Sequence, residues 1–148
     1  TQAINAPQGV SVAYTDSIPL LAVLCRPLAA ALGGTFQYFG WFTLVCFALQ
    51  GGFAALLCGL FAEGLAAPLA GSLVFAASPI LLERAFRHTS LGAQWLVLAA
   101  LYCYFVCRRQ SRFASRGLFV INILAVGIHP YFLPMTYAVT LALCLSTP

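Results

Sequence analysis

The chain has no lysine and very little negative charge. Its 148 residues include seven arginines and three acidic residues, and charged side chains make up 7% of the total. Ordinary globular domains have roughly 25%. A water-soluble domain of this length needs more polar surface than these few charges provide, whereas hydrophobic residues reach 62% here. The composition therefore excludes an ordinary soluble domain and predicts an integral membrane protein.

The sequence also lacks the motifs of the common soluble enzyme classes. It contains no P-loop, GxSxG, HExxH or CxxC pattern. Four of its six cysteines (Cys46, Cys58, Cys103 and Cys144) lie in or at the ends of apolar runs, where free cysteine behaves as a small hydrophobe. We identify no cofactor from the sequence, and three acidic residues leave a divalent metal open without supporting one.

Residues 1–17 lack the features of a signal peptide. They contain no charged segment followed by an apolar one. We expect them to form an extracytoplasmic loop. Both ends of the chain look cut out of a longer protein, so we expect the sequence to be a single membrane-domain fragment.

Five apolar stretches are predicted to form membrane helices, because a spanning helix needs about 20 mostly apolar residues. They cover residues 36–60, 67–82, 91–107, 117–128 and 131–147. Thr89 or Ser90 is predicted to cap the third helix. His129-Pro130 separates the last two, since proline disfavours α geometry in the residue before it. One bent helix over this final block is the alternative.

Residues 18–33 are apolar but short, and Arg26-Pro27 interrupts them. An arginine at the centre of a bilayer costs at least ~2.5 kcal/mol. An interfacial or re-entrant helix avoids that cost, because the arginine then reaches the headgroups. The predicted fold is therefore an all-α, polytopic transmembrane bundle of about five membrane helices plus this one.

Four arginines fall within residues 108–116. Between two apolar runs, such a cluster indicates a cytoplasmic basic loop before a nucleic-acid site. With this loop inside, the polar residues before and between the other helices lie together on the outer side. Arg84 and Arg87 then lie outside, against the positive-inside trend, but four arginines outweigh two. The outer side collects Tyr14, Asp16, Gln37, Arg84, Arg87, His88, Gln94 and His129.

Several of these residues have both a chemical and a structural interpretation. Asp16 is a candidate general base, or a cap for the helix that starts near Pro19. Arg84, Arg87 and His88 are candidates for a cationic platform that holds a phosphate, because arginine's planar fork suits phosphate oxygens. The alternative is a Glu83–Arg87 pair on a frayed helix end.

His129 and the glutamines have the same two interpretations. His129 is either a structural residue or a group for proton transfer or phosphate binding. Gln37, Gln50 and Gln94 are expected to form hydrogen bonds between helices.

Several short runs carry a family resemblance: Tyr14 to Leu21 (YTDSIPLL), Phe36 to Gly40 (FQYFG), Leu49-Gln50-Gly51, Ser78-Pro79, His88 with Gln94-Trp95, and His129-Pro130-Tyr131. Together they resemble an uncharacterised family of bacterial multi-spanning membrane proteins. That family is similar to the GT-C glycosyltransferases, the superfamily of protein O-mannosyltransferases and aminoarabinose transferases. The resemblance covers essentially the whole chain.

The resemblance implies a transferase of the bacterial inner membrane that moves a sugar from a polyprenyl-phosphate donor to an acceptor on the extracytoplasmic face. It implies Arg84, Arg87 and His88 at the donor phosphate, with Tyr14, Gln37 and Gln94 in support. Asp16 and His129 are the catalytic candidates, and the main carboxylate is expected upstream of Thr1. The implied partners are the lipid bilayer, the donor and an acceptor of unknown identity, with no nucleic acid. The alternatives are a transporter or flippase for a lipid-linked or anionic substrate, and a non-catalytic membrane scaffold.

Overall fold

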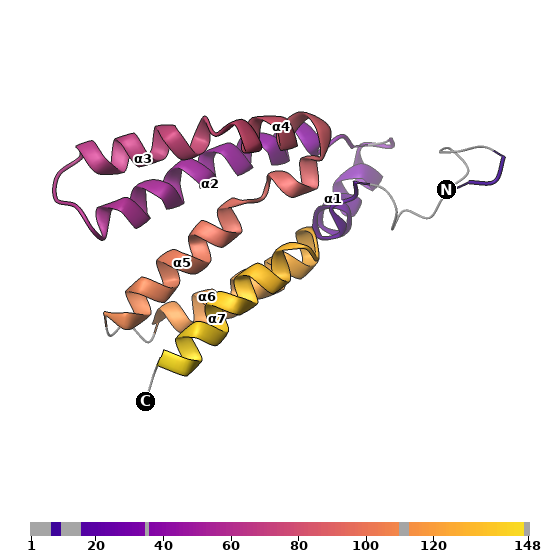
Figure 1. Cartoon of the computed structure of the whole chain (residues 1–148). Helices are drawn as coiled ribbons and strands as arrows, with labels where there is room; N and C mark the ends of the chain where they lie inside the picture. The colour runs from indigo at the N-terminus through magenta and orange to yellow at the C-terminus, as the bar shows by residue number, and fades with distance from the viewer. Residues whose placement is uncertain (1–6, 10–15, 35, 110–112, 147–148) are drawn as a thin grey trace.

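The computed structural model describes residues 7–9, 16–34, 36–109 and 113–146, and these ranges contain helices and no strand. Figure 1 shows the helices along the chain. In order they are α1 (Pro19–Ala31), α2 (Phe39–Gly59), α3 (Ala66–Ala76), α4 (Pro79–Arg87), the 3-10 helix η2 (Thr89–Gly92), α5 (Trp95–Arg108), α6 (Phe113–Ile128) and α7 (Phe132–Ser146). The predicted all-α class is confirmed.

Within the residues that the structure describes, three helical stretches are long and apolar enough to cross a membrane. They are Phe39–Gly59, Ala66–Arg87 and Thr89–Arg108. Helices α1, α6 and α7 are apolar but shorter. The sequence predicted five membrane helices, and crossing by α6 and α7 stays a prediction.

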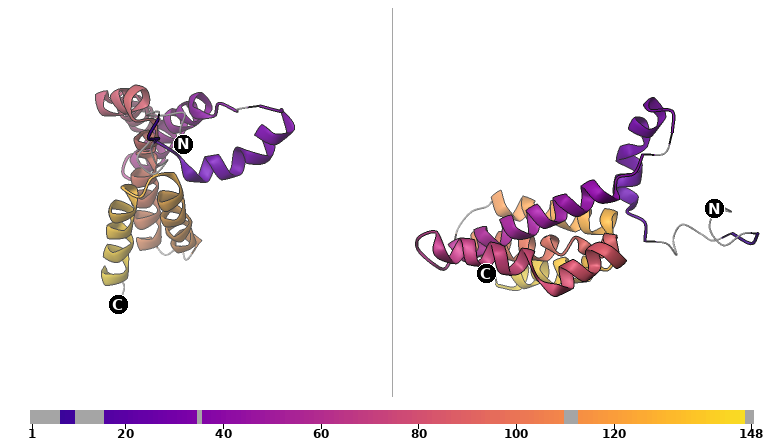
Figure 2. Two further views of the ribbon diagram at one scale, coloured as in Figure 1. Left: turned by 90° about the vertical axis from the view of Figure 1, so that its right-hand side faces the viewer. Right: turned by 90° about the horizontal axis from the view of Figure 1, so that it is seen from above.

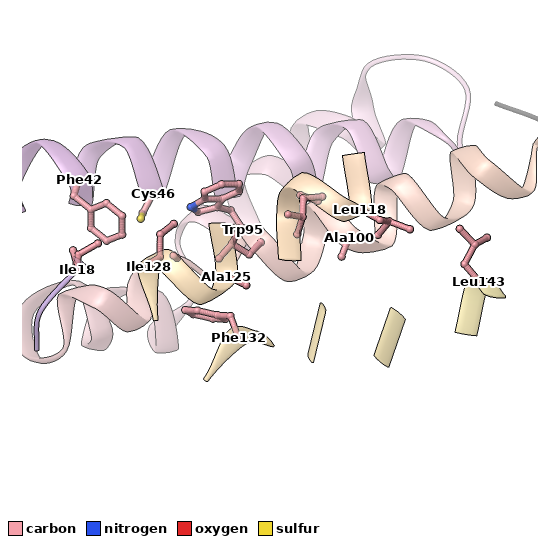
Figure 3. Close-up of a cluster of buried hydrophobic side chains, with 14 residues drawn as sticks. Ile18, Phe42, Cys46, Trp95, Ala100, Leu118, Ala125, Ile128, Phe132 and Leu143 are labelled. Carbon is pink, nitrogen blue, oxygen red and sulfur yellow. The ribbon is translucent and has the colours of Figure 1, made fainter. Parts of the chain in front are cut away.

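The helices form two layers joined by α5. Helices α2 and α3 pack as an antiparallel hairpin, and α5 contacts α2 on one side and the α6–α7 pair on the other. Figure 3 shows the buried side chains that fill this junction. They include Phe42 and Cys46 from α2, Trp95 and Ala100 from α5, Leu118, Ala125 and Ile128 from α6, and Phe132 and Leu143 from α7.

Small residues let α2 and α3 approach closely. A Cβ atom on Gly71 would lie 2.5 Å from the Cys58 sulfur, and one on Gly51 would lie 2.8 Å from the Ser72 hydroxyl oxygen. Membrane helices use such small residues at their interfaces, because lipid provides no hydrophobic drive for association. The hairpin is therefore held by close backbone packing.

The second predicted span, residues 67–82, is two helices instead of one. Ser78 interrupts the apolar run, and its Oγ accepts a hydrogen bond of 3.3 Å from the Leu81 N–H. Pro79 occupies the first turn of α4, where its missing N–H does no harm. This N-cap starts a new helix, which then carries the polar residues as far as Arg87.

The break at His129-Pro130 is confirmed. Helix α6 ends at Ile128 and α7 begins at Phe132, so the two run back along each other (Figure 1). The predicted cap at Thr89 or Ser90 is wrong. The corresponding helix α5 begins at Trp95 with Gln94 as its N-cap residue and no side-chain cap, and the Thr89 hydroxyl donates back to the Ala85 carbonyl.

Helix α1 projects from the end of the bundle instead of lying alongside the other helices (Figure 2). None of its residues is buried. Gly33, with φ +67°, ends it: the Gly33 N–H donates to the Ala30 carbonyl and the Gly34 N–H to the Ala29 carbonyl. This is a Schellman motif, which needs a left-handed residue that glycine supplies at little cost.

The opposite end of the bundle carries the predicted basic loop. Arg108 donates a 2.6 Å hydrogen bond to the Ser146 carbonyl, and Arg109 donates to the Leu60 carbonyl and lies 5.9 Å from the centre of the Phe61 ring. Both arginines therefore satisfy carbonyls at the C-terminal ends of other helices, where the helix dipole favours positive charge. Arg112 lies outside the described residues.

Candidate binding cleft at the polar end of the bundle

A cleft of about 500 Å³ opens among α2, α3, α4, α5 and α7. Its polar lining residues come from separate parts of the chain, and they are Gln50, Ser78, Arg84, Gln94 and Tyr131. Apolar side chains, including Phe75, Ile80, Leu91, Phe132 and Met135, form the rest of its wall. The volume and the few polar groups in an apolar wall are typical of small-molecule sites.

Arg84 is the one charged residue in that lining. It is half-buried, and within the described residues its guanidinium makes no ion pair. Arg87 instead lies 3.8 Å from Glu83 on the exposed side of α4, so the predicted Glu83–Arg87 pair is confirmed. His88 is exposed and does not line the cleft. Of the three residues predicted as a cationic platform, the structure brings Arg84 alone to the cleft.

Gln50 lies near the middle of the 21-residue helix α2, about 16 Å from its first residue at 1.5 Å per residue. It is only 3% exposed, and among the described residues no donor reaches its Oε1. The expected hydrogen bond between helices is therefore absent for this oxygen. Gln94, by contrast, sits at the N-terminal end of α5 and lines the cleft as well.

Asp16 is held by Ser90 from across the bundle end. The Ser90 backbone N–H donates to one carboxylate oxygen at 3.4 Å, and the Ser90 hydroxyl donates to the other. Ser90 is fully buried. The helix-cap interpretation of Asp16 is wrong, because the N-cap residue of α1 is Ile18 and no side-chain hydrogen bond caps it.

Tyr38 provides a second attachment at the same end. It hydrogen-bonds to the backbone of Ile18, and burial raises the pKa of its hydroxyl above the ordinary value. Ile18 is itself fully buried. The chain segment before α1 is therefore fixed to η2 through Asp16 and to the start of α2 through Ile18.

His129 lies in the turn between α6 and α7, beside the cleft. Its Nδ1 accepts a 3.2 Å hydrogen bond from the Tyr131 backbone N–H. An accepting Nδ1 leaves the proton of the neutral ring on Nε2. Tyr131 lines the cleft, so His129 lies in the same turn as one of the lining residues. Gln37 is exposed and outside the lining, and Tyr14 lies outside the described residues.

Sequence reasoning missed a polar network inside the α6–α7 pair. Asn122 Nδ2 donates to the Thr140 hydroxyl at 2.9 Å, and the Thr136 hydroxyl donates to Asn122 Oδ1 at 2.9 Å. An asparagine within an apolar run is itself a signal, because polar groups in lipid are costly unless paired. Here the network is fully paired and joins the two helices.

Among the described residues, no three His, Cys, Asp or Glu side chains gather closely enough to hold a metal ion. The chain belongs to the family described as a domain of unknown function (DUF6311), which matches residues 1–147. Neither a curated protein nor a solved structure gave a significant match. The chain is thus a helical member of this family, and three helical stretches in the described ranges are long and apolar enough to span a membrane.

Proposed function

We propose that the chain forms the donor-binding part of an integral membrane glycosyltransferase. Its donor is a sugar linked to polyprenyl phosphate, and transfer takes place on the extracytoplasmic face of the bacterial inner membrane. One observation carries the proposal: Arg84, a cation with no acidic partner among the described residues, is the one charged residue that lines a mostly apolar cleft. Such a cleft suits an amphiphile with an anionic group.

The proposed reaction releases a negatively charged leaving group, polyprenyl phosphate. An acceptor hydroxyl attacks the anomeric carbon, its proton passes to a carboxylate, and the bond from that carbon to the phosphate oxygen breaks. Polyprenyl phosphate departs with the added negative charge. A guanidinium already directed at these oxygens stabilises them in the transition state, because it donates two parallel hydrogen bonds.

The other candidate residues have smaller roles or none in this proposal. His129 lies in the same turn as Tyr131, which lines the cleft, and its Nε2 is the ring nitrogen left to donate. Arg87 pairs with Glu83 on the exposed side of α4, and His88 is exposed at the end of that helix, so neither is assigned a contact with the donor phosphate. Asp16 accepts two hydrogen bonds from Ser90, so we do not assign it the role of base.

The test is binding of a polyprenyl phosphate to the full-length protein in phospholipid nanodiscs. Arg84→Ala is expected to weaken binding roughly 10- to 150-fold, the range for a lost charge-assisted hydrogen bond of about 1.5–3 kcal/mol. Arg116→Ala is the matched control, because Arg116 is an exposed arginine on α6, at the opposite end. Equal dissociation constants for the wild type and Arg84→Ala would contradict the proposal.

A lipid flippase is the second candidate, and Gln50 is the observation that favours it. A transport path needs polar groups at mid-depth, and Gln50 lies near the middle of α2. Two other polar residues within the apolar helices, Asn122 and Thr136, already bond to each other. Proteoliposomes with a fluorescent polyprenyl phosphate distinguish the two functions: a flippase exchanges the lipid between leaflets, whereas a transferase does not.

A further inference from the structure

The unpaired amide of Gln50 limits which part of a ligand enters the cleft. The side chain is 3% exposed, it lines the cleft, and its Oε1 has no donor among the described residues. A buried acceptor without a partner destabilises a folded protein, and the penalty persists unless a ligand or water supplies the missing donor. The inner end of the cleft therefore calls for a hydrogen-bond donor.

Neighbouring side chains do not supply that donor. The buried indole N–H of Trp95 does not reach Gln50, because its nitrogen faces the Cys46 sulfur instead (Figure 3). Ser78 is engaged as the N-cap of α4. If the amide is turned over, its NH2 group becomes the unpaired end, and the need for a polar ligand group remains.

We propose that the inner end of the cleft is a subsite for a polyhydroxylated group, the sugar of the donor, and that the prenyl chain stays outside. This inference rests on the proposed function. A hydrocarbon chain carries no donor for Gln50, and a phosphate is an acceptor that belongs at Arg84. Sugar hydroxyls donate and accept, so they satisfy the amide in either orientation.

The remaining lining fits the same ligand. Gln94 and Tyr131 provide further hydrogen-bonding groups, and Phe132 provides an apolar face for a sugar ring. The prenyl chain would lie outside the cleft against exposed apolar residues of α4, because Leu82 is 42% and Phe86 is 85% exposed and neither lines the cleft. The phosphate at Arg84 then stands between a sugar inside the cleft and a chain on the lipid side.

The experiment compares two kinds of lipid on the full chain in phospholipid nanodiscs, without glycoside detergents that would compete. The probes are farnesyl phosphate and a panel of farnesyl-phosphoryl hexoses carrying glucose, mannose or galactose. At least one hexose is expected to improve binding to the wild type about tenfold or more over farnesyl phosphate. Gln50→Leu is expected to remove that gain and leave farnesyl phosphate binding unchanged.

Two further measurements separate a binding role from a structural one. Thr43→Val is the matched control on the same helix, because the Thr43 hydroxyl already donates to the Phe39 carbonyl and lies outside the cleft. It is expected to keep the sugar-dependent gain. Gln50→Leu is expected to unfold no more easily than the wild type, since an unpaired buried polar group is removed. A glutamine kept for structure would instead lower stability when replaced.

The outcomes are distinct. Equal binding of farnesyl phosphate and every hexose to the wild type overturns the sugar subsite and leaves the proposed function standing. A sugar-dependent gain that survives Gln50→Leu also overturns it. Failure of the wild type to bind any of these lipids overturns the proposed function, and the subsite with it.

Discussion

The contact between Asp16 and Ser90 joins residues 74 positions apart and gives the sharpest prediction of stability. Asp16→Ala leaves the fully buried Ser90 hydroxyl and its backbone N–H without an acceptor. A hydrogen bond to a charged group contributes about 1.5–3 kcal/mol, and an unpaired buried donor costs about 1–3 kcal/mol. We therefore expect Asp16→Ala to lower the free energy of unfolding by about 2–3 kcal/mol.

A double-mutant cycle isolates the contact itself. Ser90→Ala removes the hydroxyl but keeps the backbone N–H bond, so we expect a loss of about 1–2 kcal/mol. The double variant should then be less destabilised than the sum of the single ones, with a coupling energy of about 1–2 kcal/mol. Reversible unfolding in mixed micelles measures all three variants. Additivity within about 0.3 kcal/mol would refute the contact.

The same variants separate a structural Asp16 from a catalytic one. If the carboxylate only fixes the chain before α1, Asp16→Asn and Ser90→Ala lose stability and turnover in parallel. If it is the general base, Asp16→Asn loses turnover by orders of magnitude while Ser90→Ala stays active. Turnover with a lipid-linked sugar in the full-length protein reads out the difference. The hydrogen bonds to Ser90 lead us to expect the parallel pattern.

Two further predictions concern the contacts between helices, with the same unfolding assay. Gly71→Ala is expected to cost about 1–3 kcal/mol, because its Cβ would meet the Cys58 sulfur. Adding Cys58→Ala to Gly71→Ala should restore the lost stability. Gly52→Ala should keep the wild-type free energy of unfolding, because nothing lies within 4 Å of its Cβ. Equal losses of stability at both glycines would contradict close packing. Asn122→Leu should lose about 0.6–1.7 kcal/mol, the range for hydrogen bonds between membrane helices, and unchanged stability would show that its network does not hold α6 to α7.

The sequence was sufficient to predict most of the helices, because apolar runs and proline positions determine them locally. His129-Pro130 ended α6 as expected, since the ring of Pro130 disfavours α geometry before it. The Ser78-Pro79 break was missed because both neighbours are apolar and the run looks continuous. A serine directly before a proline is nevertheless a cap followed by a favoured first-turn residue, and this pair marks the start of α4.

The candidate site was predictable only in part. Charged and amide side chains are rare in this chain, so Arg84 and Gln94 were readily singled out. Which of these side chains faces the cleft depends on the rotation of each helix about its axis. Arg87 lies on the exposed side of α4, where it pairs with Glu83. The Asp16–Ser90 contact depends on where η2 lies relative to α1, which no local pattern encodes.

Two polar side chains that lack a partner line the same cleft, and their position favours a transferase over a transporter. Arg84 is a cation without an acidic partner among the described residues, and Gln50 is a buried amide without a donor. Proteins retain such unpaired groups mainly at functional sites, since each lowers stability. A path for transport would distribute polar groups through the bundle, whereas Asn122 and Thr136 satisfy each other. One ligand with a phosphate for Arg84 and hydroxyls for Gln50 satisfies both groups at once, and a sugar phosphate carried on a lipid has that composition.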